Sequence, residues 1–209
     1  MIEAGLTWEN AQATYATNTE VVKRNSWVRH TIKIADAFCR FVGVRGKVLD
    51  VGCGNGHYSG MTYEEAGVKY LDLVNNSVTG VDPITPNYET RFPVDIAKAE
   101  SLPYADNSFD AVIFATSLDH MESPQLALQE ARRVVKNSGS VIIWNSVFIY
   151  GNAQFKDNRH LHMWDSNALF QLMDAAGLVV FMVAYGPTVA GFSSCFMECN
   201  KKTKTDEEV

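Results

Sequence analysis

Three glycines at alternate positions follow directly on a short apolar segment. The segment at residues 47–51 leads into Gly52, Gly54 and Gly56. Glycine has no Cβ, so a ligand can pack directly on the backbone of such a turn. The GxGxG spacing differs from the GxGxxG spacing that is typical of dinucleotide-binding turns. We therefore expect a ligand-binding loop that holds something other than a dinucleotide.

Two acidic residues accompany this loop. Asp50 stands two residues before the first glycine, and Asp82 ends a second apolar segment. A carboxylate beside the loop would repel a pyrophosphate and attract a ligand that bears an ammonium and a sulfonium. A carboxylate at the end of the second strand can accept hydrogen bonds from both hydroxyls of a ribose. Each residue also has a structural alternative, because Asp50 could cap the next helix and Asp82 could initiate a turn before Pro83.

A third block, residues 99–110, has the sequence AESLPYADNSFD and leads into a strongly apolar segment. In order and spacing, the three blocks resemble the class I S-adenosylmethionine-dependent methyltransferases, in particular the subgroup with the series DVGCGxG, GVD and AExLPxxDxSFD. The resemblance covers about residues 48–143 and extends more loosely to Cys199. It implies S-adenosyl-L-methionine as the cofactor and methyl transfer as the activity. Residues 99–102 could alternatively be a loop that only fills the sheet edge.

The resemblance also implies a role for each matching residue. Asp50 would face the methionine end of the cofactor, and Asp82 would hold the ribose, with Pro83 beside the adenine. The three glycines would let the cofactor approach the loop. The other expected cofactor contacts are Ala99, Glu100 and Leu102 at the adenine, and Thr116 and Ser117 near the sulfonium and the amino group.

Two departures from the subgroup concern the adenine pocket. Many relatives have an acidic residue just before the Ala-Glu pair to accept from the adenine amino group, and this chain has Lys98 there. Asp95 is a weak candidate to replace it. The connection at residues 83–95 contains three prolines, so a full-length helix is not expected in it.

His120 is the first candidate for proton removal. Methyl transfer needs a general base only if the acceptor is a hydroxyl or a protonated amine. His120 follows the fourth expected strand, on the side of the sheet where ligands bind in open α/β folds. The ordinary pKa of a histidine side chain is about 6.5, which suits proton removal. Asp119 could orient the ring. The structural alternative is a histidine that packs at the start of the next helix.

His160 and His162 form a second candidate group, after a loop with Tyr150, Phe155 and Arg159. Their alternate spacing places them on one side of an extended segment. They could act as a base, recognise the acceptor or bind a metal, or His162 could pack with Trp164 as a lid over the cofactor. We predict His120 or His162 as the base. We predict no metal site, because no acidic or cysteine residue is spaced as a partner.

The elements that must position these residues alternate between strands and helices. This alternation predicts an α/β fold with a parallel sheet and helices on both faces, closed by an antiparallel hairpin. The resemblance implies a Rossmann-like sheet of seven strands in the order 3-2-1-4-5-7-6, with an antiparallel last strand. We expect strands at 47–51, 77–82, 110–116 and 140–148, helices at 20–42, 58–66, 124–135 and 165–176, a weak strand or loop at 71–74, and a hairpin at 178–184 and 192–199.

The 209 residues predict a single domain at 1–200. We divide it into an N-terminal lid and helix (1–43), a cofactor-binding half (44–148) and an acceptor-side loop, helix and hairpin (149–200), with a disordered tail at 201–209. Trp8, Tyr15 and Trp27 would form a lid or acceptor pocket, or would only attach the first helix to the sheet. The basic residues Arg132, Arg133 and Lys136 are expected on the solvated face of their helix and at its C-terminal end, where their charge suits the helix dipole.

The composition and net charge limit the kinds of partner that the protein is expected to bind. The net charge of −6 argues against a broad basic face for nucleic acid and favours a small-molecule acceptor. No apolar run is long enough to span a membrane, and the N-terminus does not resemble a secretory signal, so we expect a cytoplasmic protein with four reduced cysteines. The oligomeric state is not predicted.

Two other functions stay open at this point. The first is a non-catalytic protein that binds S-adenosylmethionine and serves as a partner subunit. The second is an NAD(P)-dependent oxidoreductase, against which Asp50 and the glycine spacing argue. We predict methyl transfer to an oxygen or nitrogen nucleophile of a small molecule.

Overall fold

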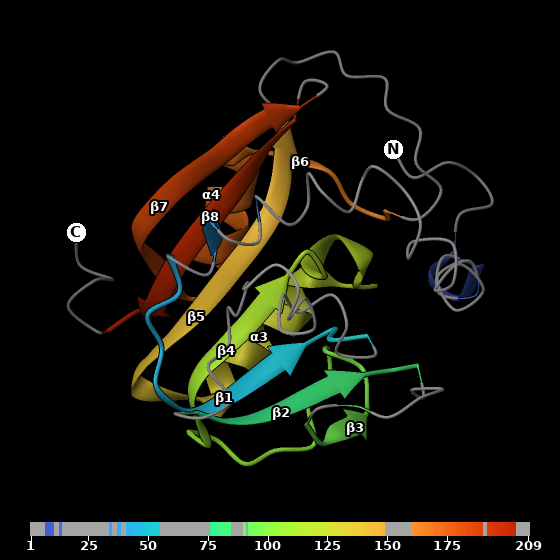
Figure 1. Cartoon of the computed structure of the whole chain (residues 1–209), viewed down its shortest axis with the longest axis vertical. Helices are drawn as coiled ribbons and strands as arrows, with labels where there is room; N and C mark the ends of the chain where they lie inside the picture. The colour runs from blue at the N-terminus through green and yellow to red at the C-terminus, as the bar shows by residue number, and fades with distance from the viewer. Residues whose placement is uncertain are drawn as a thin grey trace.

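The computed structural model describes residues 41–54, 76–84, 92–148, 160–189 and 192–203, together with 7–10 and positions 13, 34, 37, 38 and 90. The described strands form one sheet (Figure 1). They are β1 (Gly46–Val51), β2 (Asn76–Asp82), β3 (Val94–Ile96), β4 (Phe109–Ala115), β5 (Val135–Phe148), β6 (Trp164–Asp165), β7 (Leu178–Val189) and β8 (Phe192–Lys201).

The strand order is β3-β2-β1-β4-β5-β8-β7, and Figure 1 shows it running from β3 at one edge to β7 at the other. Strands β1 to β5 pair in parallel, and β8 lies antiparallel between β5 and β7. The short β6 pairs in parallel with the end of β5. The predicted fold class and the predicted order 3-2-1-4-5-7-6 are therefore confirmed for the seven main strands, and β6 is an addition.

Continuous apolar runs explain why the central strands are buried on both faces. Ile113 and Ile142 lie in one core cluster, together with Phe38 from the N-terminal segment. Their neighbours Val112 and Ile143 lie in the other cluster, with helices α3 (Pro124–Val134) and α4 (Ser166–Ala175). Successive side chains of a strand point to opposite faces, so the two clusters mark the two faces of the sheet.

Capping residues fix where the helices α3 and α4 begin. Ser123 caps α3, its hydroxyl accepting a hydrogen bond from the Leu126 N–H at 3.4 Å, and Pro124 takes the first position. Asp165 caps α4 by accepting from the Ala168 N–H at 2.8 Å. Gly177 follows α4 with a φ of 74°. These features confirm the helices predicted at 124–135 and 165–176.

The structure differs from expectation at β3 and β5. Strand β3 lies in the proline-rich connection, where no strand was expected, and pairs with β2 from Gly80↔Val94 onward. Its three residues alternate apolar and polar side chains, but the run is too short to predict a strand. Strand β5 begins at Val135, directly after α3, whereas the sequence predicted its start at residue 140.

Several predictions fall on residues outside those described. These are most of the helix at 20–42, the helix at 58–66, the segment 71–74, the loop before His160, Tyr15, Trp27, Cys39 and most of the tail. The described cysteines, Cys53, Cys195 and Cys199, are buried free thiols, as predicted. Within the described part of the chain, none of the helices has the length and apolar character that a membrane span requires.

Candidate functional site

The loop after β1 is shaped by two glycines in left-handed conformation. Gly52 has a φ of 68° and Gly54 a φ of 57°. A Cβ on Gly52 would lie 2.6 Å from the Ser117 Cβ, so only glycine lets this loop meet the loop after β4. A Cβ on Gly54 would meet no described atom within 4 Å. The backbone at Gly54 is therefore open to a ligand among the described residues, whereas Gly56 lies outside them.

Asp82 connects the ends of β1 and β2. Its Oδ2 accepts a hydrogen bond from the Gly54 N–H at 2.8 Å, and its Oδ1 accepts from the Ile84 N–H at 2.9 Å. Burial raises the pKa of this carboxyl, while the two N–H donors and the charge of His120 oppose the rise. Each oxygen keeps a second lone pair that can accept from a ribose hydroxyl. The contact with Ile84 also shows the turn that was the structural alternative, so Asp82 can serve both purposes.

Asp50 is buried at the end of β1, beside the same loop. Burial raises the pKa of the neighbouring Cys53 thiol far above its ordinary value, and the charges of Asp50 and Asp82 raise it further. Two buried carboxylates therefore make the base of the loop electronegative, which suits a cationic ligand. Whether Asp50 caps the next helix is a question about residues outside those described.

The end of β4 packs against the glycine loop. The Ser117 hydroxyl donates a hydrogen bond to the Val51 carbonyl at 2.6 Å, and both residues are buried. Thr116 has a φ of 57°, a left-handed conformation that costs a β-branched residue about 1–2 kcal/mol. Its N–H donates to the Trp144 carbonyl at 2.8 Å. Backbone strain of this kind is concentrated at functional sites, so we take the β4 end as part of the site.

The segment that is expected to contact the adenine lies between β3 and α3. Ala99 and Leu102 are buried, and Pro83 is half-buried at the end of β2. The Glu100 carboxylate accepts from the Ser123 N–H at 3.0 Å, so its side chain is directed to the start of α3. Backbone groups, rather than the Glu100 carboxylate, are then what this segment offers a ligand.

Lys98 and Asp95 both have partners. Lys98 donates to Glu122 at 3.0 Å, and its ammonium lies 3.9 Å from the ring centroid of Trp8. Asp95 accepts from the Tyr104 hydroxyl at 2.8 Å. Neither arrangement marks an acceptor for the adenine amino group, and the contact of Trp8 attaches the N-terminal segment to this edge.

Arg133 lies in the last turn of α3 with its side chain partly exposed, and it also holds the adenine-side segment in place, a role that the sequence did not predict. Its guanidinium donates to the carbonyls of Tyr104 and Leu102 at 2.7 and 3.0 Å, and it pairs with Asp106 and Glu130. Glu130 in turn accepts from the Leu102 N–H at 2.8 Å.

Arg132 is likewise not a free surface residue, because it donates to the Gly177 carbonyl at 2.9 Å. Both arginines donate to backbone carbonyls on other segments of the chain, Arg133 in addition to its side-chain pairs with Glu130 and Asp106. A helical pattern read from the sequence contains no information about them.

Asp119 and His120 lie in the short helix η3 (Leu118–His120), just past β4. The fold brings His160 to them. His120 Nε2 is 3.9 Å from Asp119 Oδ1, and His160 Nε2 is 3.6 Å from Asp119 Oδ2. The two imidazole centroids are 4.5 Å apart. The prediction that His160 and His162 have no acidic partner considered only residues near them in the sequence. The fold brings Asp119 to His160.

His162 is placed differently from His160. Its Nε2 lies 2.9 Å from the Met121 carbonyl, and its ring stacks on Trp164 at 5.6 Å with an interplanar angle of 3°. A carbonyl only accepts, so this Nε2 carries a hydrogen and Nδ1 is the nitrogen left to accept a proton. The packing of His162 with Trp164 matches the lid alternative.

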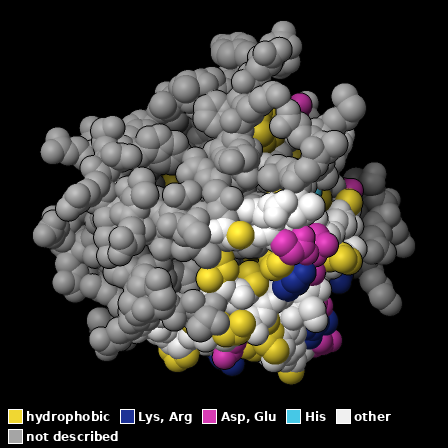
Figure 2. Space-filling model, turned by 90° about the vertical axis from the view of Figure 1, so that its right-hand side faces the viewer, with side chains coloured by type: hydrophobic (Ala, Val, Ile, Leu, Met, Phe, Trp, Pro, Cys, Tyr) yellow, Lys and Arg dark blue, Asp and Glu magenta, His cyan; other side chains and the backbone are white. Residues whose placement is uncertain are grey.

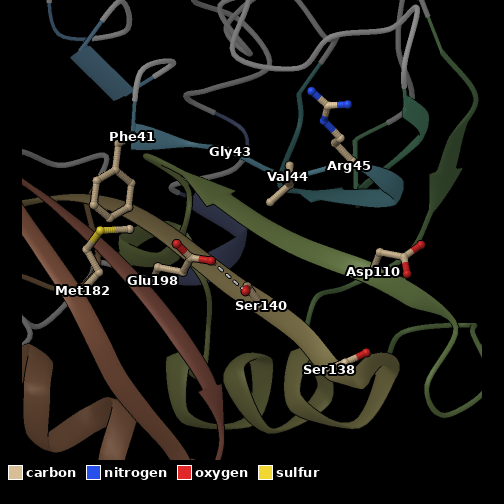
Figure 3. A pocket seen from close by; sticks show the side chains of 9 residues that line it. All are labelled: Phe41, Gly43, Val44, Arg45, Asp110, Ser138, Ser140, Met182 and Glu198. Carbon is tan, nitrogen blue, oxygen red and sulfur yellow. Dashed lines mark hydrogen bonds between the residues drawn. The ribbon is translucent and has the colours of Figure 1, made fainter.

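A cavity of about 380 Å³ lies at the other end of the sheet, at the amino ends of β1, β4 and β5 (Figure 3). Ser140 donates to Glu198 at 2.7 Å in its wall. Ligands of open α/β sheets bind at the carboxyl ends of the strands, so this cavity is not the candidate site. It is lined by Phe41, Gly43, Val44, Arg45, Asp110, Ser138, Ser140, Met182 and Glu198.

The described surface in Figure 2 has acidic and basic side chains next to one another. Lys98 pairs with Glu122, Arg133 with Asp106, and Lys136 with Asp110. Such pairing is consistent with the expectation that the protein does not bind nucleic acid, which stays a prediction.

Comparison with known proteins agrees with this geometry. Residues 49–143 match the family model described as a methyltransferase domain. The chain is similar to the ubiquinone/menaquinone biosynthesis C-methyltransferase UbiE of Cupriavidus taiwanensis, with 36% identity over 102 residues. The match covers 46% of this chain and 42% of that protein, so the chain spans less than half of the relative's length.

Solved structures share the fold at low sequence identity. The 1,6-didemethyltoxoflavin-N1-methyltransferase of Burkholderia thailandensis, solved with 1,6-didemethyltoxoflavin and S-adenosylhomocysteine, has a TM-score of 0.68 at 18% identity. That alignment covers 97% of this chain and 94% of the other. The [4+2]-cyclase SpnF has a TM-score of 0.65 at 20% identity and covers 86% and 84% of the two chains. Because a cyclase shares this fold, the fold alone does not decide the reaction.

Proposed function

We propose that this chain methylates a small-molecule acceptor with S-adenosyl-L-methionine, because residues 49–143 match the family model of a methyltransferase domain. The observation that carries the proposal is the carboxylate of Asp82, held on the Gly54 N–H at the carboxyl ends of β1 and β2. The family's cofactor, S-adenosyl-L-methionine, is a cationic nucleoside, and this is the ligand class that the site suits.

The described residues fit the cofactor on two independent points. Gly54 leaves open space where a side chain would stand, and Asp82 retains lone pairs for ribose hydroxyls. Asp50 adds a second buried carboxylate for the methionine end. We assign the cofactor contacts to the predicted set, namely Asp50, Gly52, Gly54, Gly56, Asp82, Pro83, Ala99, Glu100, Leu102, Thr116 and Ser117.

Positioning is the main contribution of the chain to catalysis. The bound cofactor supplies a methyl group on a good leaving group, a sulfonium. Aligning an acceptor lone pair with that methyl can contribute about 7–11 kcal/mol to lowering the barrier. The strained Thr116 and the buried Ser117 fix the β4 end, from which the acceptor-side residues follow. We propose that the acceptor binds between this end and the segment at 160–164.

Proton removal is assigned to His120 or His162 where the acceptor carries a proton. His120 is the closer of the two to the cofactor loop along the fold, because it lies in η3 directly after the β4 end that packs against that loop. His162 can accept a proton only through Nδ1, given the contact of its Nε2 with Met121. Replacing either base with alanine should lower kcat while leaving cofactor affinity unchanged. Unchanged turnover in both variants would leave alignment as the whole mechanism.

The acceptor atom is proposed as oxygen or nitrogen. The relatives named above are a C-methyltransferase and an N1-methyltransferase, so activated carbon acceptors belong in the same test. Transfer of a labelled methyl group from S-adenosylmethionine to the small-molecule fraction of a cell extract would identify the acceptor. Binding of the cofactor without any transfer would instead support a partner-subunit role.

Cofactor binding is tested by calorimetry with S-adenosylhomocysteine. Asp82→Ala should weaken binding at least tenfold, because it removes the ribose acceptor and the anchor of the Gly54 loop. Asp110→Ala is the matched control, a carboxylate at the amino end of β4, and should bind like the wild type. Equal binding by Asp82→Ala, or stabilisation by NAD rather than S-adenosylhomocysteine in a thermal-shift comparison, would contradict the assignment.

A further inference from the structure

We propose that Asp119, His120 and His160 form a binding site for a divalent first-row transition metal ion, with Zn²⁺ as the reference ion. Each residue offers one ligand atom, and these atoms all lie within 4.8 Å of one another. The carboxylate stands between the two rings, with one oxygen 3.9 Å from His120 Nε2 and the other 3.6 Å from His160 Nε2.

These separations are close to those of a metal centre. Zn²⁺ lies about 2.0–2.2 Å from nitrogen and oxygen ligands, which places tetrahedral ligand atoms about 3.4 Å from one another. The two histidine–carboxylate distances are to different oxygens of Asp119, and with one ligand atom from each residue the set spans up to 4.8 Å. Side-chain rotation on binding of the ion would therefore have to bring the three ligand atoms about an ångström closer together.

Burial of Asp119 is the second observation. Its side chain is nine-tenths buried, and its Oδ1 has no hydrogen-bond partner among the described residues. A buried carboxylate oxygen without a hydrogen bond is costly. A cation bound between the carboxylate and the imidazoles would remove that cost.

The backbone holds the two parts of the site together. The N–H groups of Leu161 and His162 both donate to the Asp119 carbonyl, at 3.0 and 3.2 Å. The His162 ring adds a third contact, to the Met121 carbonyl at 2.9 Å. His160 is thus fixed beside His120 by hydrogen bonds that do not use either of these two imidazole rings. A site that is positioned before the ion arrives is what tight metal binding requires.

The donor set selects the class of ion. Two imidazoles and one carboxylate suit Zn²⁺, Fe²⁺, Co²⁺ or Mn²⁺, whereas Ca²⁺ and Mg²⁺ prefer sites made of oxygen ligands. Three protein ligands leave at least one coordination position open, as in catalytic zinc sites.

A role for the open position follows if the proposed methyl transfer holds. The oxygen or nitrogen of the acceptor would bind the ion there and lose its proton to water more readily. Its lone pair would then form the bond to the methyl carbon, and the electrons of the carbon–sulfur bond would leave with the sulfur. His120 would act as a metal ligand in this scheme and would not remove the proton itself.

Metal binding is measured on the untagged full chain, stripped with a chelator. Co²⁺ serves as the optical probe through its visible absorption bands, and Zn²⁺ content is measured by elemental analysis after dialysis. We expect one ion per chain. Asp119→Asn and His160→Gln should each weaken binding at least tenfold. Glu122→Gln is the matched control, because Glu122 lies in the same segment but pairs with Lys98, and it should bind like the wild type.

The outcomes separate this proposal from the cofactor assignment. Less than one ion per chain in the wild type, or equal affinity in the His160→Gln variant, would overturn the metal site. His160 is partly exposed, so this variant provides the test even if Asp119→Asn does not fold. S-adenosylhomocysteine calorimetry on the stripped protein tests the cofactor site alone. Loss of that binding would count against the cofactor assignment and leave the metal result standing.

Discussion

The two ends of the sheet use the same residue type in opposite ways. At the carboxyl ends of the strands, Asp82 is buried, and burial raises its pKa. At the amino ends, Asp110 is partly exposed, and its pKa is lowered, first by the hydrogen bond from Lys136 and then by that from the Lys47 N–H. A carboxylate with a matched cation at the surface contributes to folding. Among the described residues, the hydrogen bonds to the buried Asp82 carboxylate come from backbone N–H groups, which leaves lone pairs for a ligand.

Backbone conformation shows the same contrast. Gly52, Gly54 and Thr116, at the carboxyl ends, all have left-handed φ values. At the amino ends Gly46, Asn107 and Gly177 also have positive φ values, of 104°, 55° and 74°, so the contrast lies in the residue types and not in the sign of φ. Asparagine tolerates this conformation, whereas a β-branched threonine is strained in it. Strain is therefore retained at the end where a ligand is expected.

The largest effect is expected for Gly52→Ala. The left-handed φ costs about 1–2 kcal/mol, and the contact of the new Cβ with Ser117 adds about 1–3 kcal/mol of overpacking. We expect the free energy of unfolding to fall by about 2–5 kcal/mol in urea titrations, with loss of S-adenosylhomocysteine binding. Gly54→Ala is the control and should lose only about 1–2 kcal/mol, since its Cβ meets no described atom. Equal losses would show that the approach of the two loops is unimportant.

Arg133→Met should have the next largest effect. It removes charged hydrogen bonds to the carbonyls of Leu102 and Tyr104, which we expect to cost about 2 kcal/mol because the side chain is partly exposed. Cofactor affinity should also fall, since the adenine-side segment loses its support. Lys136→Met, at the amino end of the sheet, should cost about 0.5 kcal/mol and leave affinity unchanged. Urea titration and calorimetry measure both, and a reversed ranking would contradict the role of Arg133.

Thr116→Gly should raise stability by about 0.5–1 kcal/mol, because glycine relieves the left-handed strain and loses only part of the gain through chain entropy. Turnover should fall, since the β4 end is less firmly held. Asn107→Gly should give no gain in stability, because asparagine is not strained there. A gain at Asn107 equal to that at Thr116 would remove the contrast between the two ends.

The smallest effect is expected for Asp110→Asn. The folded-state pKa of Asp110 lies below its ordinary value of 3.8, so its contribution is present above that pH and is lost as the pH falls through the folded-state value. After allowance for solvent screening, we expect about 0.5 kcal/mol at pH 7. Urea titrations at pH 7 and pH 3 should show a smaller difference between variant and wild type at pH 3 than at pH 7, and salt should reduce it. A difference that is as large at pH 3 as at pH 7 and does not respond to salt would exclude the ion pair as its cause.

Local patterns determined much of this protein from the sequence alone. The glycine loop, the carboxylates that end β1 and β2, and the capped helices α3 and α4 depend on residues within a few positions of one another. Continuous apolar runs marked β1, β4 and β5 because these strands are buried on both faces. The strand order came from resemblance to a family, and a pattern of apolar residues alone does not specify it.

Only the tertiary structure decided which distant groups meet. The contact of Gly52 with Ser117, the carbonyls that Arg133 binds, and the approach of His160 to Asp119 each join segments far apart in the sequence. Strand β3 pairs with β2, although its own three residues are too short a run to predict a strand from the sequence. Hydrophobic periodicity records which face of an element is buried. It does not record which polar groups the buried faces bring together, and those groups make up the candidate site.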